Sequence, residues 1–194
     1  MFKWLHKTNK QTAPKSSALD RSPSLGTSAR AGAVALPEII NIALQHHQAG
    51  RLSEAEAAYR EILAVDPENI DALHFSGVIA YQRGENEQAA EWISRALARN
   101  ASNAPAHNNL GNVLVRQGKL EEAIACYRKA LAFQPDYVDA HINLGAAFRA
   151  RGELDEAVAC YQRALSLAPD IPTIHSNLGN LLSDRGKPEE AIAC

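Results

Sequence analysis

From Leu36 onward, apolar residues recur along the chain with a helical period, and glycine interrupts that period at a constant distance. Apolar positions three or four residues apart predict amphipathic helices rather than strands. The glycines that recur every 34 residues are Gly50, Gly84, Gly118, Gly152 and Gly186. The 194-residue chain therefore contains a repeat of 34 residues without insertion or deletion.

Counted with this glycine at position 15, the repeats start at Leu36, Ile70, Ala104, Val138 and Pro172. Four repeats are complete. The fifth stops after 23 positions, so we expect the sequence to be cut in the middle of a helix. Each repeat predicts two helices. The first covers about positions 2 to 14 and ends at the glycine, which can adopt the left-handed conformation that closes a helix. The second begins near position 18 and ends before a proline that three repeats carry at position 32.

Local residues support this division. Ser53 with Glu56 fits a capping box, and Asn86 and Asp155 are residues that favour the start of a helix. Small residues recur at positions 8, 20 and 27, where they let helix backbones approach, and large ones at positions 7 and 24 fill the space between.

Asn-Leu-Gly, then Gly, Glu-Glu-Ala, Tyr, Ala and Pro at these positions resemble the tetratricopeptide repeat, TPR. The resemblance covers residues 36–194. It implies an all-α fold, a right-handed TPR superhelix (α-solenoid) of antiparallel helix pairs whose neighbouring repeats share one core. We therefore divide the chain into a basic N-terminal arm at 1–35, complete repeats at 36–69, 70–103, 104–137 and 138–171, and a truncated repeat at 172–194.

The resemblance also implies that positions 2, 5, 6, 9, 12 and 13 face the concave inner surface, where the family binds its partners. The asparagines at positions 6 and 9 are Asn41, Asn109, Asn112, Asn143, Asn177 and Asn180, and the inward cations are Arg116 and Arg149. An amide offers both a donor and an acceptor to a peptide group. Neighbouring repeats lie about 10 Å apart, a distance that an extended peptide covers in about three residues. We take these eight residues as the candidate peptide-binding site.

Two alternatives stay open. The six asparagines recur from repeat to repeat like the rungs of a ladder, and we call them the amide ladder. Their side chains could hydrogen-bond within the stacked repeats instead of binding a ligand. The motifs NNLGN, INLGA and SNLGN, each preceded by His, with EEAIACY following, resemble the superhelix of O-GlcNAc transferases and their bacterial SPINDLY-like relatives. That resemblance implies a substrate-recruiting region of a larger protein glycosyltransferase, with its catalytic domain outside this chain. The leading hypothesis is a protein–protein interaction scaffold without catalytic residues of its own.

Charge separates the arm from the repeats. Residues 1–35 carry +5 and the remaining residues −7, so the net charge of −2 gives no case for nucleic-acid binding. The arm shows no sustained apolar period, and we expect it to be disordered. For residues 1–10 we favour a solvated tail over contact with a membrane. Without a signal-peptide core or a long apolar stretch, the sequence predicts a cytoplasmic protein.

The cysteines and several histidines are single positions copied between repeats: position 23 in Cys126, Cys160 and Cys194, and position 4 in His107, His141 and His175. Copies about 10 Å apart exceed the roughly 7 Å that a disulfide allows between Cα atoms, and they cannot share one zinc ion at about 2 Å. We expect packing roles for these residues, no metal and no cofactor. The oligomeric state is left open.

Overall fold

The structure, a computed structural model, describes residues 36–184. Over this range the chain forms nine α-helices and no strand. They are α1 (Leu36–Gln48), α2 (Leu52–Val65), α3 (Ile70–Arg83), α4 (Asn86–Arg99), α5 (Ala104–Arg116), α6 (Leu120–Phe133), α7 (Val138–Arg151), α8 (Leu154–Leu167) and α9 (Pro172–Asp184). The all-α prediction is confirmed. The predicted arm at 1–35 and the end of the truncated repeat lie outside the described residues.

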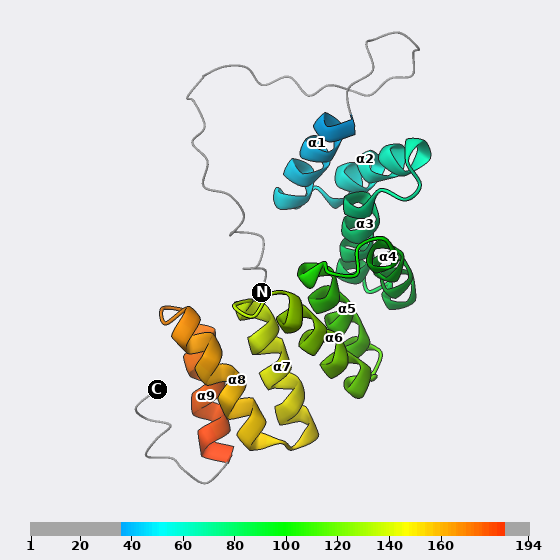
Figure 1. Cartoon of the computed structure of the whole chain (residues 1–194). Coiled ribbons are helices and arrows are strands. Elements are labelled where there is room, and N and C mark those ends of the chain that lie inside the picture. Colours follow the sequence, from blue (N-terminus) through cyan, green and yellow to red (C-terminus); the bar gives the residue numbers. More distant parts are fainter. Residues whose placement is uncertain (1–35, 185–194) are drawn as a thin grey trace, which may run out of the picture.

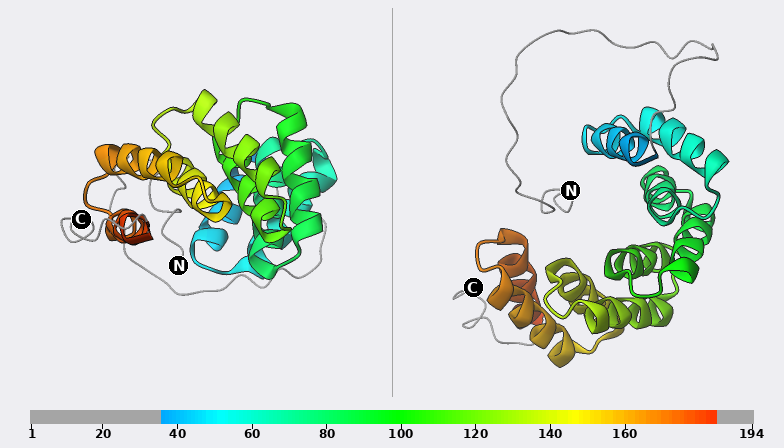
Figure 2. Two further views of the ribbon diagram at one scale, coloured as in Figure 1. Left: turned by 90° about the horizontal axis from the view of Figure 1, so that it is seen from below. Right: turned by 45° about the horizontal axis from the view of Figure 1, so that its top comes forward.

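Consecutive helices pair as hairpins, and the hairpins follow one another around an open arc (Figure 1, Figure 2). In the four complete repeats each first helix packs against its own second helix, and each second helix packs against the first helix of the next repeat. The first helices also meet one another, because α3 contacts α5 and α5 contacts α7. In a curved stack, equivalent helices of successive repeats lie closest together on the concave side. Because the first helices are the ones that contact one another, they line the inner side of the arc. The predicted solenoid of helix pairs is confirmed.

Glycine ends the first helices as predicted. Gly84 and Gly152 are the C-caps of α3 and α7, with φ of 83° and 84°. Gly50 and Gly118 also have positive φ, at 74° and 75°. Only a residue without Cβ adopts this left-handed conformation at little cost, which explains why the spacing of glycine reveals the repeat.

The prediction for the starts of the second helices is wrong in its capping residues. α2, α4 and α8 begin at position 17, and their N-caps are Arg51, Glu85 and Glu153, none of which makes a side-chain cap. The predicted capping residues Ser53 and Asp155 lie one residue inside the helices, and Asn86 is the first residue of α4. Side-chain caps occur instead on first helices, where Oδ1 of Asn69 accepts from the Ala72 N–H and Asn103 caps α5 in the same way.

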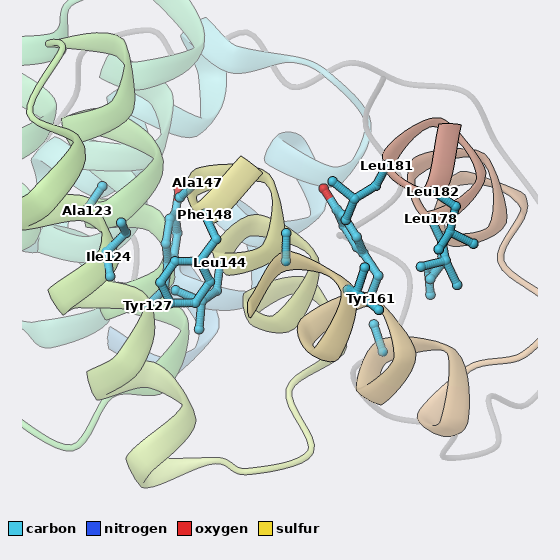
Figure 3. Close-up of a cluster of buried hydrophobic side chains, with 14 of the residues drawn as sticks. Ala123, Ile124, Tyr127, Leu144, Ala147, Phe148, Tyr161, Leu178, Leu181 and Leu182 are labelled. Atoms are coloured by element: carbon cyan, nitrogen blue, oxygen red, sulfur yellow. The ribbon is translucent and has the colours of Figure 1, made fainter. Parts of the chain in front are cut away.

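Positions 8 and 24 pack against each other across the hairpins, as the small and large residues predicted. A Cβ added to Gly111 would lie 2.4 Å from the ring of Tyr127, and one added to Gly145 would lie 3.0 Å from the ring of Tyr161. Tyr127 is 2% exposed and packs in a core cluster with Leu144 of the next repeat (Figure 3). The glycine at position 8 therefore lies directly against the tyrosine at position 24 of the same helix pair.

Candidate functional site

The eight candidate binding residues all lie on first helices. Asn41 is on α1, Asn109, Asn112 and Arg116 are on α5, Asn143 and Arg149 on α7, and Asn177 and Asn180 on α9. Positions 6 and 9 are one helical turn apart and share a face. Exposure differs along this ladder: Asn41, Asn180 and both arginines are exposed, Asn112, Asn143 and Asn177 are half-buried, and Asn109 is buried. The residues thus share one face but have different surroundings.

Asn109 is held by the preceding repeat. Its Nδ2 lies 2.9 Å from Nε2 of His74, and only 7% of its surface is exposed. Burial lowers the pKa of His74 to about 4, with the nearby His47 adding to the shift. The imidazole is therefore neutral near pH 7, and its Nε2 can accept a hydrogen bond from the amide. The Asn109 side chain is therefore hydrogen-bonded between two neighbouring repeats.

The same pairing recurs one repeat later. Nδ2 of Asn143 donates to Oδ1 of Asn108 at 2.9 Å. In both pairs the residue at position 6 binds the residue at position 5 of the preceding repeat. Asn108 also contacts the hydroxyl of Tyr137, whose pKa burial raises and Asn108 lowers in smaller measure. Asn143 therefore keeps its carbonyl oxygen for a ligand, while one of its donors is engaged.

Asn112 is engaged within its own repeat. The hydroxyl of Tyr127 donates to Oδ1 of Asn112 at 2.8 Å, and burial raises the pKa of that hydroxyl. The alternative that the sequence left open, hydrogen bonding within the stack, thus applies to three of the six amides: Asn109, Asn112 and Asn143.

The other three amides, Asn41, Asn177 and Asn180, make no hydrogen bond within residues 36–184. For Asn177 the reason lies in the preceding repeat. Its partner at position 5 would be Ile142, which has no hydrogen-bonding group in its side chain. Asn177 is half-buried and keeps both its donor and its acceptor.

The two arginines are exposed, and an aromatic neighbour holds Arg116. The guanidinium of Arg116 lies 3.9 Å from the ring centroid of Tyr81, and its Nη1 donates to the Tyr81 carbonyl at 2.8 Å. Arg149 lies near Tyr161, because its charge lowers the pKa of that hydroxyl against the larger upward shift from burial. Arg116 is therefore held in a defined position against the first helix of the preceding repeat.

Sequence reasoning missed an aromatic cluster in the first two repeats. The rings of Tyr59 and Phe75 stack with centroids 5.8 Å apart, His74 stacks on Phe75 at 5.0 Å, and His47 meets Phe75 edge-on at 5.9 Å. Phe75 occupies position 6, where the other four repeats have asparagine. That difference was the available signal. In the second repeat, position 6 therefore carries a phenylalanine that packs in a largely buried aromatic cluster instead of an amide.

The histidines at position 4 have the packing role that the sequence predicted. Each donates from Nε2 to the carbonyl at position 32 of the preceding repeat: His107 to Ala101 at 2.9 Å, His141 to Pro135 at 2.8 Å, and His175 to Pro169 at 2.7 Å. These bonds fasten the loop between repeats to the next helix.

The described cysteines, Cys126 and Cys160, are free thiols. Burial raises the pKa of both, that of Cys160 to about 11. Cys194 lies outside the described residues. Across residues 36–184 no group of His, Cys, Asp and Glu side chains could hold a metal ion. In the same part of the chain no helix has the length and apolar character needed to cross a membrane.

Family comparisons agree with this architecture. Models of the tetratricopeptide repeat match residues 41–105 and 92–125, and a model of the TPR repeat matches residues 111–149 and 145–186. Together the matches run without a gap from 41 to 186. The fold and its inner face define a helical-repeat protein, and the chain belongs to the tetratricopeptide repeat family.

Solved structures share the fold. MamA is 25% identical, with a TM-score of 0.70, over 78% of this chain and 89% of its own. A TPR protein of Thermus thermophilus, TTC0263, is 25% identical, with a TM-score of 0.69, over 82% of this chain and 87% of its own. PilF from Pseudomonas aeruginosa is 25% identical, with a TM-score of 0.76, over 81% of this chain and 72% of its own. No curated protein matches the chain. Nothing in these matches ties it to O-GlcNAc transferases, so that narrower resemblance stays a prediction.

Proposed function

We propose that this chain is a protein-interaction scaffold that binds an extended peptide segment along the inner side of its repeats. The observation that carries the proposal is the recurrence of amide side chains at the same positions of consecutive first helices, on the side where those helices meet. Asn143 and Asn177 are half-buried and Asn180 is exposed, so each is reachable by a ligand. The fold shared with MamA fits such a scaffold.

The spacing of the repeats suits a peptide backbone. Successive layers lie about 10 Å apart, and an extended chain rises about 3.3 Å per residue, so about three ligand residues pass each layer. An amide satisfies the C=O and N–H that every residue of the ligand carries. A ladder of amides therefore holds the backbone of a segment with little demand on its side chains.

The test blocks the path of the ligand with one substitution. Ala146 is exposed on α7 at position 9, between the candidate residues Asn143 and Arg149. Peptides selected from a random phage-displayed library on the unmodified chain serve as the probe, labelled for fluorescence anisotropy. We expect Ala146→Arg to weaken binding at least about tenfold, because its long side chain fills the path and a tenfold loss corresponds to only about 1.4 kcal/mol.

Ala159→Arg is the matched control, because Ala159 is an exposed alanine in the second helix α8 and the same residue types are exchanged. It should bind the probe as the unmodified chain does. Equal binding by both variants, with unchanged helical circular dichroism, would show that the peptides do not use the inner side.

A further inference from the structure

We infer that the residue at position 5 of each repeat decides whether the amide at position 6 of the next repeat is available to a ligand, and that Ile142 thereby makes Asn177 the main amide anchor of the inner side. The inference rests on the proposed function. It adds which amide binds the ligand and which neighbouring residue determines whether that amide is available.

The four junctions between described repeats differ at these two positions. The pairs of position 5 with the following position 6 are Ile40 with Phe75, His74 with Asn109, Asn108 with Asn143, and Ile142 with Asn177. The first pair is apolar, and both side chains pack on the same core cluster. The second and third pairs are hydrogen-bonded at 2.9 Å. In the fourth an amide follows an isoleucine, and the described residues offer it no hydrogen bond.

Asn177 is also well placed for binding. On the same helix Ile174 is 0% and Leu178 5% exposed, in a core cluster against which Ile142 packs. α9 is therefore anchored next to the amide, and a half-buried side chain loses less conformational freedom when a ligand arrives. Its Oδ1 and Nδ2 can bind the N–H and the C=O of one peptide backbone at the same time. Asn143 can accept a bond through its oxygen but has one donor engaged with Asn108.

The first variant gives the amide of Asn177 a hydrogen-bond partner within the protein. Ile142→Asn copies Asn108 into the fourth junction, so its amide can engage Asn177 as Asn108 engages Asn143. We expect the library-selected peptide probe to bind about fivefold more weakly, which corresponds to the loss of one ordinary hydrogen bond. Ile142→Val is the control, because it also changes the packing of position 142 but offers no hydrogen bond. It should bind as the unmodified chain does.

The second variant releases an amide, that of Asn143, which is hydrogen-bonded to Asn108 in the unmodified chain. Asn108→Ile places at position 108 the residue that positions 40 and 142 already carry. It removes the acceptor that Asn143 uses and frees that amide, so probe affinity should rise about fivefold. A gain in affinity is informative because partial unfolding would lower affinity instead. Circular dichroism establishes that each variant keeps its helices.

A double-mutant cycle separates the inference from the proposed function. Asn177→Ala should weaken binding about fivefold in the unmodified chain and have no further effect beside Ile142→Asn. Additive losses, or an Asn177→Ala variant that binds as before while Ala146→Arg still weakens binding at least about tenfold, would overturn the inference and leave the inner-side proposal standing. If Ala146→Arg also leaves binding unchanged, the proposed function itself fails.

Discussion

Replacing Gly111 by alanine tests the packing that brings each helix pair together. A Cβ at this position would lie 2.4, 2.8 and 2.8 Å from three ring atoms of Tyr127. The ring cannot retreat easily, because it is 2% exposed and its hydroxyl is bonded to Asn112. Overpacking of this kind costs up to about 3 kcal/mol, whereas alanine gains about 1 kcal/mol over glycine inside a helix. We expect Gly111→Ala to lower the free energy of unfolding by about 2 kcal/mol.

Gly145→Ala is the matched substitution one repeat later. Its Cβ would lie 3.0 to 3.2 Å from its neighbours, a distance that small shifts relieve. Here the overpacking cost of about 1 kcal/mol and the helix gain of about 1 kcal/mol offset each other, so stability should hardly change. Urea unfolding followed by far-ultraviolet circular dichroism measures both variants. Equal effects, or a stabilised Gly111→Ala variant, would refute the reasoning.

The first repeat shows how the strain in Gly111→Ala could be relieved. It has Ala43 at position 8 and Leu44 at position 9, and the Tyr59 hydroxyl has no hydrogen-bond partner among the described residues. A tyrosine not bonded to position 9 thus tolerates a Cβ at position 8. Asn112→Leu beside Gly111→Ala frees Tyr127 in the same way and should recover part of the lost stability.

Three further outcomes follow from the buried polar groups. Tyr127→Phe should cost about 1 kcal/mol of stability by removing the bond to Asn112, whereas Tyr59→Phe should cost nothing, and the same urea titrations compare them. The pKa of His74 is about 4 in the folded chain, below its ordinary 6.5, so the unfolded chain binds the proton more readily. The free energy of unfolding should therefore fall as the pH drops from 6.5 toward 4, and His74→Asn should reduce that slope in urea titrations at several pH values. The Cys160 thiol, with a pKa of about 11, should react with iodoacetamide at about pH 8 several-fold more slowly in the folded chain than in urea.

The sequence predicts the fold well because the repeat multiplies weak signals. One glycine in a helical pattern says little, but Gly50, Gly84, Gly118 and Gly152 all have the positive φ that ends a first helix. The helix starts were harder to predict. Ser53 has a capping side chain, yet α2 begins at Leu52, because the turn from Gly50 determines where the helix resumes.

The sequence was enough to place the candidate site on the first helices. It could not show which amides are hydrogen-bonded within the protein and which are available to a ligand. A column of asparagines at position 6 looks uniform when repeats are aligned one above another. The bonds run diagonally, from Asn143 to Asn108 and from Asn109 to His74, so the environment of each amide depends on position 5 of the repeat before it. Comparing neighbouring columns across repeats would have revealed the difference at Ile142. The distances and burial that decide the engagement of each amide required the structure.

The bond between His74 and Asn109 makes one junction of the superhelix sensitive to acid. His107, His141 and His175 each donate an Nε2–H to a carbonyl, so these bonds need no free lone pair on the ring. His74 differs, because a charged ring can no longer accept from Asn109. Acid therefore weakens the bond between α3 and α5, at the junction of the second and third repeats that the bond from His107 to Ala101 also spans. Protonation of His74 would thus loosen the contact between the second and third repeats without releasing the bond that His107 makes across it.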